Sequence, residues 1–418
     1  MPGFSFAEGN AKKLLSLPLY ALGGLASLIV PRTNRQWVFG CGSGVGEGAL
    51  ELFRFTRAAD PTLRLTWLAR DTGEMADAAA LGIPAVLKSG RHGLWLTLRA
   101  RVVVVTHGFG DANRFGTQGA FVVQLWHGIP PKLIQLDSPV TTNSGILSRS
   151  RQLRGILRRA YKRGYRGISL MPAASGLAAT RLQTAFGLER DRIVITGDPR
   201  DDLLSRGTAE ERTATARALL FDRLRLEPGF AGRVLLYAPT WRDGAPDPGA
   251  PSAEEWRQLA AYLEASDSLL VVRPHPHGAG DYAPGLGVSA RIMLLASSAQ
   301  PDITPILPAV DLLITDYSSI AFDFSLTGRP ILFLAPDEDS YTSSRGLYEP
   351  YREFSGGREV RSWAALLVQL ARYDSDREWV ARLVAHTQHL SNLHFAFRDG
   401  RNAERVYGEI LDRLKAQQ

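Results

Sequence analysis

The 418-residue sequence contains a single cysteine, Cys41. One cysteine excludes an internal disulfide framework and a zinc site built on several thiolates, and it fits a reducing cytoplasm. No neighbouring base marks Cys41 as a nucleophile. The sequence also lacks a carboxylate cluster of the kind that indicates an obligatory magnesium site. We therefore expect catalysis without a metal and without a bound cofactor.

A dinucleotide fingerprint is also missing. Glycines stand at positions 40, 42, 44, 46 and 48, and this alternate spacing does not fit G-x-G-x-x-G. A flexible loop between the first strand and the first helix of a domain is enough to explain these glycines.

Long apolar runs are scarce, and the N-terminal run Leu14–Val30 is uncharged over only 17 residues. That length is at the lower limit for crossing a bilayer. The run contains Pro18, Gly23 and Gly24, and no small-x-small cleavage site follows it. It could lie on a membrane, pack in the fold or an interface, or act as a signal or span. We favour the first, with residues 1–30 as an apolar, membrane-associated helix.

The chain has more basic than acidic residues, 49 against 42, which gives a net charge of +7. This balance favours anionic partners such as phosphorylated substrates or a membrane surface. No basic stripe with interleaved aromatic residues is present, so we expect no nucleic-acid partner. The Arg-rich run Arg149–Arg166 is typical of a solvated or membrane-facing helix.

Strand-like and helix-like segments alternate from residue 36, which is typical of a doubly wound α/β fold. The length suggests two domains, and a polar helical run near residues 203–232 separates two α/β series. We predict two Rossmann-like domains, residues 31–203 and residues 204–418, the second ending in helices. Expected strands are Gln36–Phe39, Leu65–Leu68, Val102–Thr106, Phe121–Leu125, Ser169–Met171, Ile193–Thr196, Val234–Tyr237, Leu269–Val272, Arg291–Leu295, Leu312–Thr315 and Ile331–Leu334.

The segment from Asp311 to Leu334 reads as strand, polar turn, helix and strand. Ser318 and Ser319 stand where the helix is expected to begin. A helix opening at the carboxyl end of a parallel strand offers backbone N–H groups to an anion, which predicts a phosphate-binding turn. The alternative is that one serine is an ordinary helix cap.

Polar clusters follow several other expected strands. His127 has the intrinsic pKa of a general base, two prolines flank His275, and an arginine can clamp a phosphate. Each also has a structural alternative: a core histidine, a solvated arginine or a plain loop. His275 and His277 could hold a metal, but no carboxylate or cysteine complements them nearby. The candidate binding residues are Gly128, Lys132, Arg200, Thr240, Arg242, Asp316, Ser318, Ser319 and Arg345.

A further histidine, His107, follows the expected strand Val102–Thr106. It either lines the site or is structural.

Taken in order, the motifs W-H-G-I-P-x-K, G-x-P-R-x-D, Y-A-P-T-W-R, P-H-P, T-D-Y-S-S-x-x-F-D-F and R-G-x-Y resemble the CDP-glycerol glycerophosphotransferase family. Its members are teichoic-acid primases and polymerases and related capsule polymerases. The resemblance covers roughly residues 20–410. It implies a GT-B-like fold, a peripheral location at the cytoplasmic face of the membrane, an N-terminal acceptor domain and a C-terminal CDP-donor domain.

The resemblance also implies a reaction: a polyol phosphate passes from CDP-glycerol or CDP-ribitol to a hydroxyl of a lipid-linked or glycan acceptor, and CMP is released. His127 and His275 match the family's two essential histidines, and one of them would be the base. Ser318 and Ser319 match its phosphate-binding turn. Two other functions stay open: a GT-B glycosyltransferase that uses a nucleotide sugar, and a non-catalytic scaffold in envelope assembly.

Overall fold

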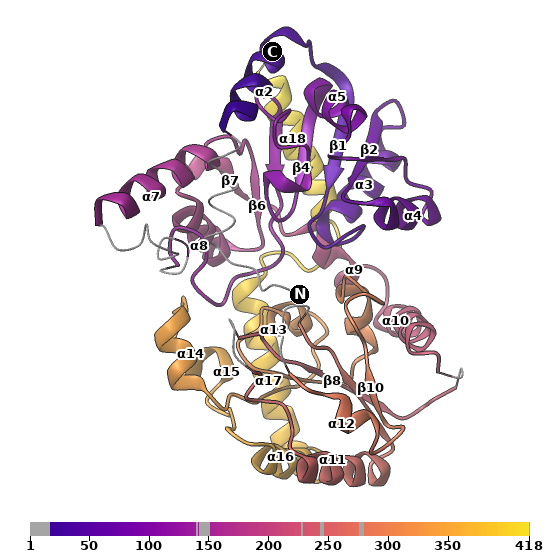
Figure 1. Ribbon diagram of the computed structural model, residues 1–418. Helices are drawn as coiled ribbons and strands as arrows, with labels where there is room; N and C mark the ends of the chain where they lie inside the picture. Colours follow the sequence, from indigo (N-terminus) through magenta and orange to yellow (C-terminus); the bar gives the residue numbers. More distant parts are fainter. Residues whose placement is uncertain are drawn as a thin grey trace. The chain divides into compact units, whose positions relative to one another are not determined.

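The computed structural model describes residues 17–138, 141, 151–226, 229–242, 246–275 and 280–417 (Figure 1). These residues form two compact units. The N-terminal unit contains the described residues up to Gly128, those of Ile134–Asp202 and those from Phe395 onward. The C-terminal unit contains Ile129–Leu133 and Leu203–His394.

The N-terminal unit is built on a parallel five-stranded sheet in the order β3-β2-β1-β4-β5, beside which β6 pairs in parallel with β7. Its strands are β1 Thr33–Gly40, β2 Arg64–Ala69, β3 Ala85–Leu87, β4 Ala100–Val105, β5 Phe121–Gln124, β6 Met171–Ala173 and β7 Ile193–Ile195. Its helices are α2 Leu17–Ile29, α3 Glu47–Ala59, α4 Thr72–Ala80, α5 Arg91–Arg99, α7 Arg151–Tyr165, α8 Gly176–Phe186 and α18 Asn402–Lys415, with short 3-10 helices η1 Phe109–Asp111, η3 Arg190–Arg192 and η4 Pro199–Asp201.

The C-terminal unit repeats this topology, with the parallel order β10-β9-β8-β11-β12. Its strands are β8 Arg233–Ala238, β9 Ser268–Val272, β10 Ile292–Leu294, β11 Leu312–Thr315 and β12 Ile331–Phe333. Its helices are α10 Ala209–Leu224, α11 Ala253–Ala265, α12 Ala283–Leu286, α13 Ile320–Ser325, α14 Glu338–Arg345, α15 Tyr351–Ser355, α16 Trp363–Ser375 and α17 Arg377–His394, with η5 Thr304–Ala309; the short helix α9 Asp202–Ser205 starts at the boundary. The predicted doubly wound α/β fold is confirmed.

Alternate residues of the central strands enter cores on opposite faces of the N-terminal sheet. Trp37 and Phe39 of β1 belong to one buried cluster, whereas Val38 belongs to another. Val102 and Val103 of β4 divide in the same way. A parallel strand covered on both faces carries a continuous apolar run, and for this reason the sequence predicts these strands well.

The last helix, α18, does not belong to the domain that a division between residues 203 and 204 predicts for it. Val406 and Ile410 of α18 are fully buried in the same core as Phe53 of α3. Residues from Phe395 onward therefore complete the N-terminal unit, although the sequence reading placed them with residues 204–418. Two helices, α16 and α17, precede α18. Asp376 ends α16 and accepts a hydrogen bond from the backbone N–H of Trp379 in the first turn of α17 (2.9 Å).

Helix α2 packs through its glycines and exposes its leucines. A side chain on Gly23 would meet the Phe115 carbonyl oxygen at 2.0 Å, so the helix backbone lies directly on the loop that carries Phe115. The opposite side is apolar and open, with Leu22 62% exposed and Leu28 84% exposed. Among the described residues, no helix combines the length and the hydropathy needed to cross a bilayer.

Candidate functional site

Several predicted site residues of the C-terminal unit gather at the switch point of its sheet, whereas in the N-terminal unit His127 follows β5 and Arg200 follows β7. In a doubly wound sheet, ligands bind where the strand order reverses, outside the carboxyl ends of the two central strands. These strands are β1 and β4 in the N-terminal unit, and β8 and β11 in the C-terminal unit. Thr240 and Arg242 follow β8, and Asp316 directly follows β11.

In the C-terminal unit, Arg242 ties three loops together. Its Nε and Nη2 donate to the two carboxylate oxygens of Asp337 at 2.7 and 2.8 Å, and its Nη1 donates to Asp316 Oδ2 at 3.1 Å. Nη1 also donates to the Thr240 carbonyl. Four of the five N–H groups of a guanidinium are thereby given to protein acceptors. Arg242 therefore joins three loops of this unit, and its expected contact with a phosphate stays a prediction.

Asp316 organises the same turn from the other side. Its Oδ1 accepts the backbone N–H groups of Thr240 (2.8 Å) and Tyr317 (2.7 Å). Its side chain and that of Arg242 are only 4% and 8% exposed. For Asp337, burial would raise the pKa, but the hydrogen bonds and charge of Arg242 outweigh it and lower the pKa. The pKa of Arg242 is raised, since its two carboxylates outweigh the effect of burial.

Aromatic rings cover this ion-pair network. The rings of Tyr317 and Tyr341 stack with centroids 4.0 Å apart, and the guanidinium of Arg242 lies 4.7 Å from the Tyr341 centroid. Lys132 donates to the Tyr341 hydroxyl at 3.1 Å. The backbone N–H of Leu133 donates to the Gly346 carbonyl at 3.1 Å, which places Lys132 with the C-terminal unit.

Another group of side chains in the C-terminal unit consists of His275, Trp241 and Arg345. The rings of Trp241 and His275 stack with centroids 5.6 Å apart and planes 18° apart. The Arg345 guanidinium lies 5.5 Å from the centroid of the Trp241 ring. The structure thus brings the predicted histidine and a predicted cation onto one indole ring. His277 lies outside the described residues.

The Ser318–Ser319 turn is formed as expected, although α13 has only six residues. Ser319 is the N-cap residue and makes no side-chain cap hydrogen bond. Ser318 Oγ accepts the backbone N–H of Ile320 only at 3.5 Å, the limit for such a bond. The capping alternative therefore has little support in the geometry.

In the N-terminal unit, His127 follows β5 at a strained point of the backbone. The preceding residue, Trp126, has φ +66°, which is a rare and costly conformation for a bulky side chain. The His127 ring stacks on His107 with centroids 4.3 Å apart and planes 6° apart. It also contacts the Trp126 ring at 4.1 Å. The imidazole therefore packs against two rings at the carboxyl edge of the sheet.

Arg200 supports His127 from the neighbouring turn. Its Nη1 donates to the His127 carbonyl, and its own backbone N–H donates to Asp198 Oδ1 at 3.2 Å. Asp202, in the same motif, accepts the backbone N–H groups of Asn402 and Ala403 at the start of α18. The G-D-P-R-D-D motif thus fixes both the histidine turn and the last helix.

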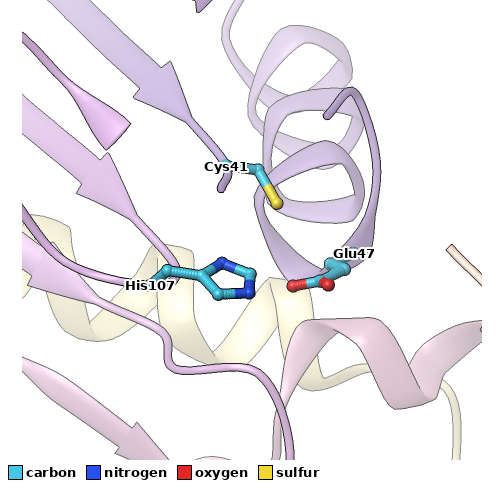
Figure 2. Close-up of side chains that lie close together, drawn as sticks. All are labelled: Cys41, Glu47 and His107. Carbon is cyan, nitrogen blue, oxygen red and sulfur yellow. The ribbon is translucent and has the colours of Figure 1, made fainter. Parts of the chain in front are cut away.

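One group of side chains in the N-terminal unit could hold a metal ion. Ligand atoms of Cys41, Glu47 and His107 all lie within 4.8 Å of one another (Figure 2). Sequence reading treated Cys41 and His107 separately and missed Glu47. Glu47 has φ +54°, and no sequence pattern predicts that conformation for a glutamate.

One pocket in the described part of the chain, of about 480 Å³, is lined by residues of α15 and α17 and their surroundings, among them Glu349, Arg352, His386 and His389. It contains none of the predicted site residues.

Comparison with known proteins gives consistent matches. Residues 27–412 match the sequence profile of the CDP-Glycerol:Poly(glycerophosphate) glycerophosphotransferase family. The chain is 30% identical over 232 residues to the teichoic acid ribitol-phosphate polymerase TarK of Staphylococcus aureus, an alignment that covers 55% of this chain and 42% of TarK. It is 28% identical over 293 residues to the teichoic acid glycerol-phosphate transferase of the same organism, covering 69% of this chain and 70% of that protein.

Solved structures show the same fold. The wall teichoic acid polymerase TagF matches with a TM-score of 0.75 at 19% identity, covering 96% of this chain and 93% of that chain. Structures of a TagF variant soaked with CDPG also match. The UDP complex of S. aureus MnaA matches less well, with a TM-score of 0.54 at 14% identity over 91% of this chain and 96% of that chain. The chain spans about two fifths of the length of TarK and of a second ribitol-phosphate polymerase, TarL.

Proposed function

Because the chain belongs to the CDP-glycerol:poly(glycerophosphate) glycerophosphotransferase family, we propose that it transfers a polyol phosphate from a CDP-activated donor. The donor is CDP-glycerol or CDP-ribitol, and the acceptor is a hydroxyl of a lipid-linked or glycan polymer of the teichoic-acid or capsule type. The observation that carries this proposal is the family match over residues 27–412. The strand-end positions of His127 and His275 support it.

The reaction forms one P–O bond and breaks another. The acceptor hydroxyl oxygen attacks the β-phosphorus of the donor in line. The bond from that phosphorus to the bridging oxygen breaks, and CMP leaves with this oxygen. One of His127 and His275 accepts the hydroxyl proton, which is worth about 100- to 10,000-fold in rate. Positioning and charge stabilisation supply most of the remainder.

We assign the donor to the C-terminal unit. The backbone N–H groups and hydroxyls of Ser318 and Ser319 receive the diphosphate, and the cation of Arg345 adds charge stabilisation. Thr240, Arg242 and Asp316 keep this turn in place through their mutual hydrogen bonds. Lys132 donates a hydrogen bond to the Tyr341 hydroxyl, and the Tyr341 ring contacts Arg242.

We assign the acceptor to the N-terminal unit. His127 and Gly128 form the turn that meets the acceptor hydroxyl. Arg200 holds that turn through the His127 carbonyl.

The two histidines provide the test of this mechanism. The variant that removes the base, either His127→Asn or His275→Asn, should lower the rate of CMP release by at least about 100-fold, because a general base is lost. His92→Asn, an exposed histidine of α5, is the matched control and should keep the wild-type rate. Near-normal turnover in both His127→Asn and His275→Asn would contradict the mechanism.

We further propose that α2 lies on the cytoplasmic face of the cell membrane. Its glycines pack on the protein, and its open side presents leucines. Replacing Leu22, Leu25 and Leu28 together by serine should weaken binding to anionic phospholipid vesicles by roughly a hundredfold, at about 1 kcal/mol for each leucine. Leu81→Ser, at an exposed leucine elsewhere in the same unit, is the control. Equal vesicle sedimentation of the triple variant and the wild type would contradict this placement.

A further inference from the structure

Three side chains with different ligand chemistry converge at the switch point of the N-terminal sheet. Cys41 directly follows β1, Glu47 is the first residue of α3, and His107 lies two residues after the end of β4. Their sulfur, oxygen and nitrogen atoms lie within 4.8 Å of one another. Figure 2 shows the thiol, the carboxylate and one ring nitrogen directed toward a common point.

The backbone is shaped to hold these groups together. Glu47 takes a left-handed conformation with φ +54°, which costs about 1 kcal/mol or more for a residue other than glycine. A side chain at position 42 would come within 2.7 Å of the His107 ring, so only glycine lets the Cys41 loop approach it. Asp111 fixes the other loop by accepting the backbone N–H groups of Thr106 (3.0 Å) and His107 (2.6 Å).

The surroundings of His107 resemble those of a metal-ligating histidine. Its Nδ1 lies 2.8 Å from Thr106 Oγ1, which in turn donates to Asp111 Oδ2 at 3.3 Å. In the tautomer with a proton on Nδ1, this nitrogen donates to the hydroxyl and Nε2 keeps its lone pair. Such a relay to a carboxylate is the usual second shell of a histidine ligand. In the other tautomer, Nδ1 accepts the longer 3.3 Å contact from the backbone N–H of Gly42.

A thiol and a carboxylate lie close together at this point. The hydroxyl of Ser43 lies between the two groups, 3.0 Å from Cys41 Sγ and 2.7 Å from Glu47 Oε1. Metal binding releases the thiol proton, and the charge of a divalent ion would balance the thiolate and the carboxylate. Arg70 donates to the Gly42 carbonyl and pairs with Asp71.

We propose that Cys41, Glu47 and His107 bind one divalent metal ion of the zinc class. One thiolate, one imidazole and one carboxylate are ligands that zinc and cobalt share, whereas magnesium and calcium prefer oxygen alone. Three protein ligands leave a fourth position for water or a substrate oxygen. His107 is exposed, which gives the ion a path into the site. The proposal concerns binding only and does not depend on the proposed transfer reaction.

Cobalt provides a direct test, because Cys41 is the only cysteine of the chain. Any thiolate-to-cobalt charge-transfer absorbance must therefore come from Cys41. Tag-free protein, kept reduced with a phosphine, is titrated with Co²⁺ and then with competing Zn²⁺. We expect the band to saturate at one equivalent of Co²⁺ and to disappear as Zn²⁺ displaces it.

Variants separate this site from adventitious binding. Cys41→Ser should abolish the band, and Glu47→Gln and His107→Gln should each weaken cobalt binding at least about tenfold. His92→Gln is the control and should bind as the wild type. Zn²⁺ should also raise the thermal midpoint of the wild type, since an ion that binds only the folded state stabilises it, and should not raise that of Glu47→Gln.

Two outcomes would overturn the proposal. One is the absence of a charge-transfer band in the wild type at millimolar Co²⁺. The other is a band whose affinity is unchanged in Glu47→Gln and His107→Gln while circular dichroism shows both variants to be folded, because the ion would then use Cys41 without the other two ligands.

Discussion

Arg242 offers the sharpest test of how the donor-side turn is held. Arg242→Met removes four hydrogen bonds and leaves two carboxylates without their cation. Breaking a buried ion pair by removing one partner costs about 3–5 kcal/mol. Because the Asp337 side chain is 19% exposed, water can solvate it in part, and we expect the lower end, about 3 kcal/mol.

Amide hydrogen exchange measures this loss of stability at individual backbone N–H groups. The backbone N–H groups of Thr240 and Tyr317 both donate to Asp316 Oδ1, so their protection reports the turn itself. A loss of about 3 kcal/mol corresponds to roughly a hundredfold faster exchange. Arg233→Met is the control, because the Arg233–Asp374 pair is about one third exposed on each side and such pairs contribute about 1 kcal/mol or less.

The pKa of Asp337 predicts how the stability loss in Arg242→Met depends on pH. In the wild type the folded-state pKa of Asp337 is lowered, so its stabilisation is present above the unfolded pKa of about 3.9 and is lost as the pH falls through the lower folded value. In Arg242→Met the Asp337 carboxylate lacks the cation that lowers its pKa, so this stabilisation is absent at every pH. The stability difference between the two proteins should therefore be constant above the unfolded pKa of about 3.9 and shrink as the pH falls below it. Unchanged protection of Thr240 and Tyr317 in Arg242→Met, together with lost activity, would refute the supporting role and indicate direct substrate contact.

Two further predictions concern stability. Gly197→Ala should lower the free energy of unfolding by about 3 kcal/mol, because φ is +77° and the new Cβ would meet Asn402 Oδ1 at 2.0 Å. Gly82→Ala, with φ +64° and open space around the new Cβ, should lower it by only about 1 kcal/mol. Equal losses for the two variants in thermal unfolding would contradict the close approach of Gly197 to Asn402. Burial lowers the folded pKa of His386 below 6.5, and the charge of Arg358 adds to this, although a hydrogen bond with the Phe354 carbonyl acts in the opposite direction. The neutral form of His386 therefore stabilises the fold above pH 6.5, and this contribution is lost as the pH falls below 6.5. In His386→Gln the free energy of unfolding, measured with urea, should decline less steeply as the pH falls. An unchanged pH dependence of the free energy of unfolding would contradict this prediction.

The elements that the sequence predicts well are those whose signal is local. Strands β8 and β11 are continuous apolar runs, because both faces of a central parallel strand are buried. Strand β3 is not among the expected strands, and none of its three residues is fully buried. The place of α18 could not be read from its own residues, since its partner in the core is α3, far away along the chain.

The site shows the same division between local and distant information. The positions of His127 and Ser318 at strand ends follow from motifs and periodicity. The supporting role of Arg242 does not, because its main partner, Asp337, lies 95 residues further along the chain. Likewise, a buried cysteine and a strand-end histidine look unrelated until the left-handed Glu47 and the close approach of Gly42 bring them together.

The most direct test of the proposed function is to measure both products of one turnover. The protein is incubated with a lipid-linked acceptor and, in parallel, with CDP-glycerol, CDP-ribitol, a UDP-sugar and a CMP-sugar, and mass spectrometry follows the nucleotide and the acceptor together. We predict CMP release from a CDP-polyol, matched mole for mole by one added polyol phosphate on the acceptor. Sugar transfer from the UDP- or CMP-sugar, with no reaction of either CDP-polyol, would contradict the proposed function.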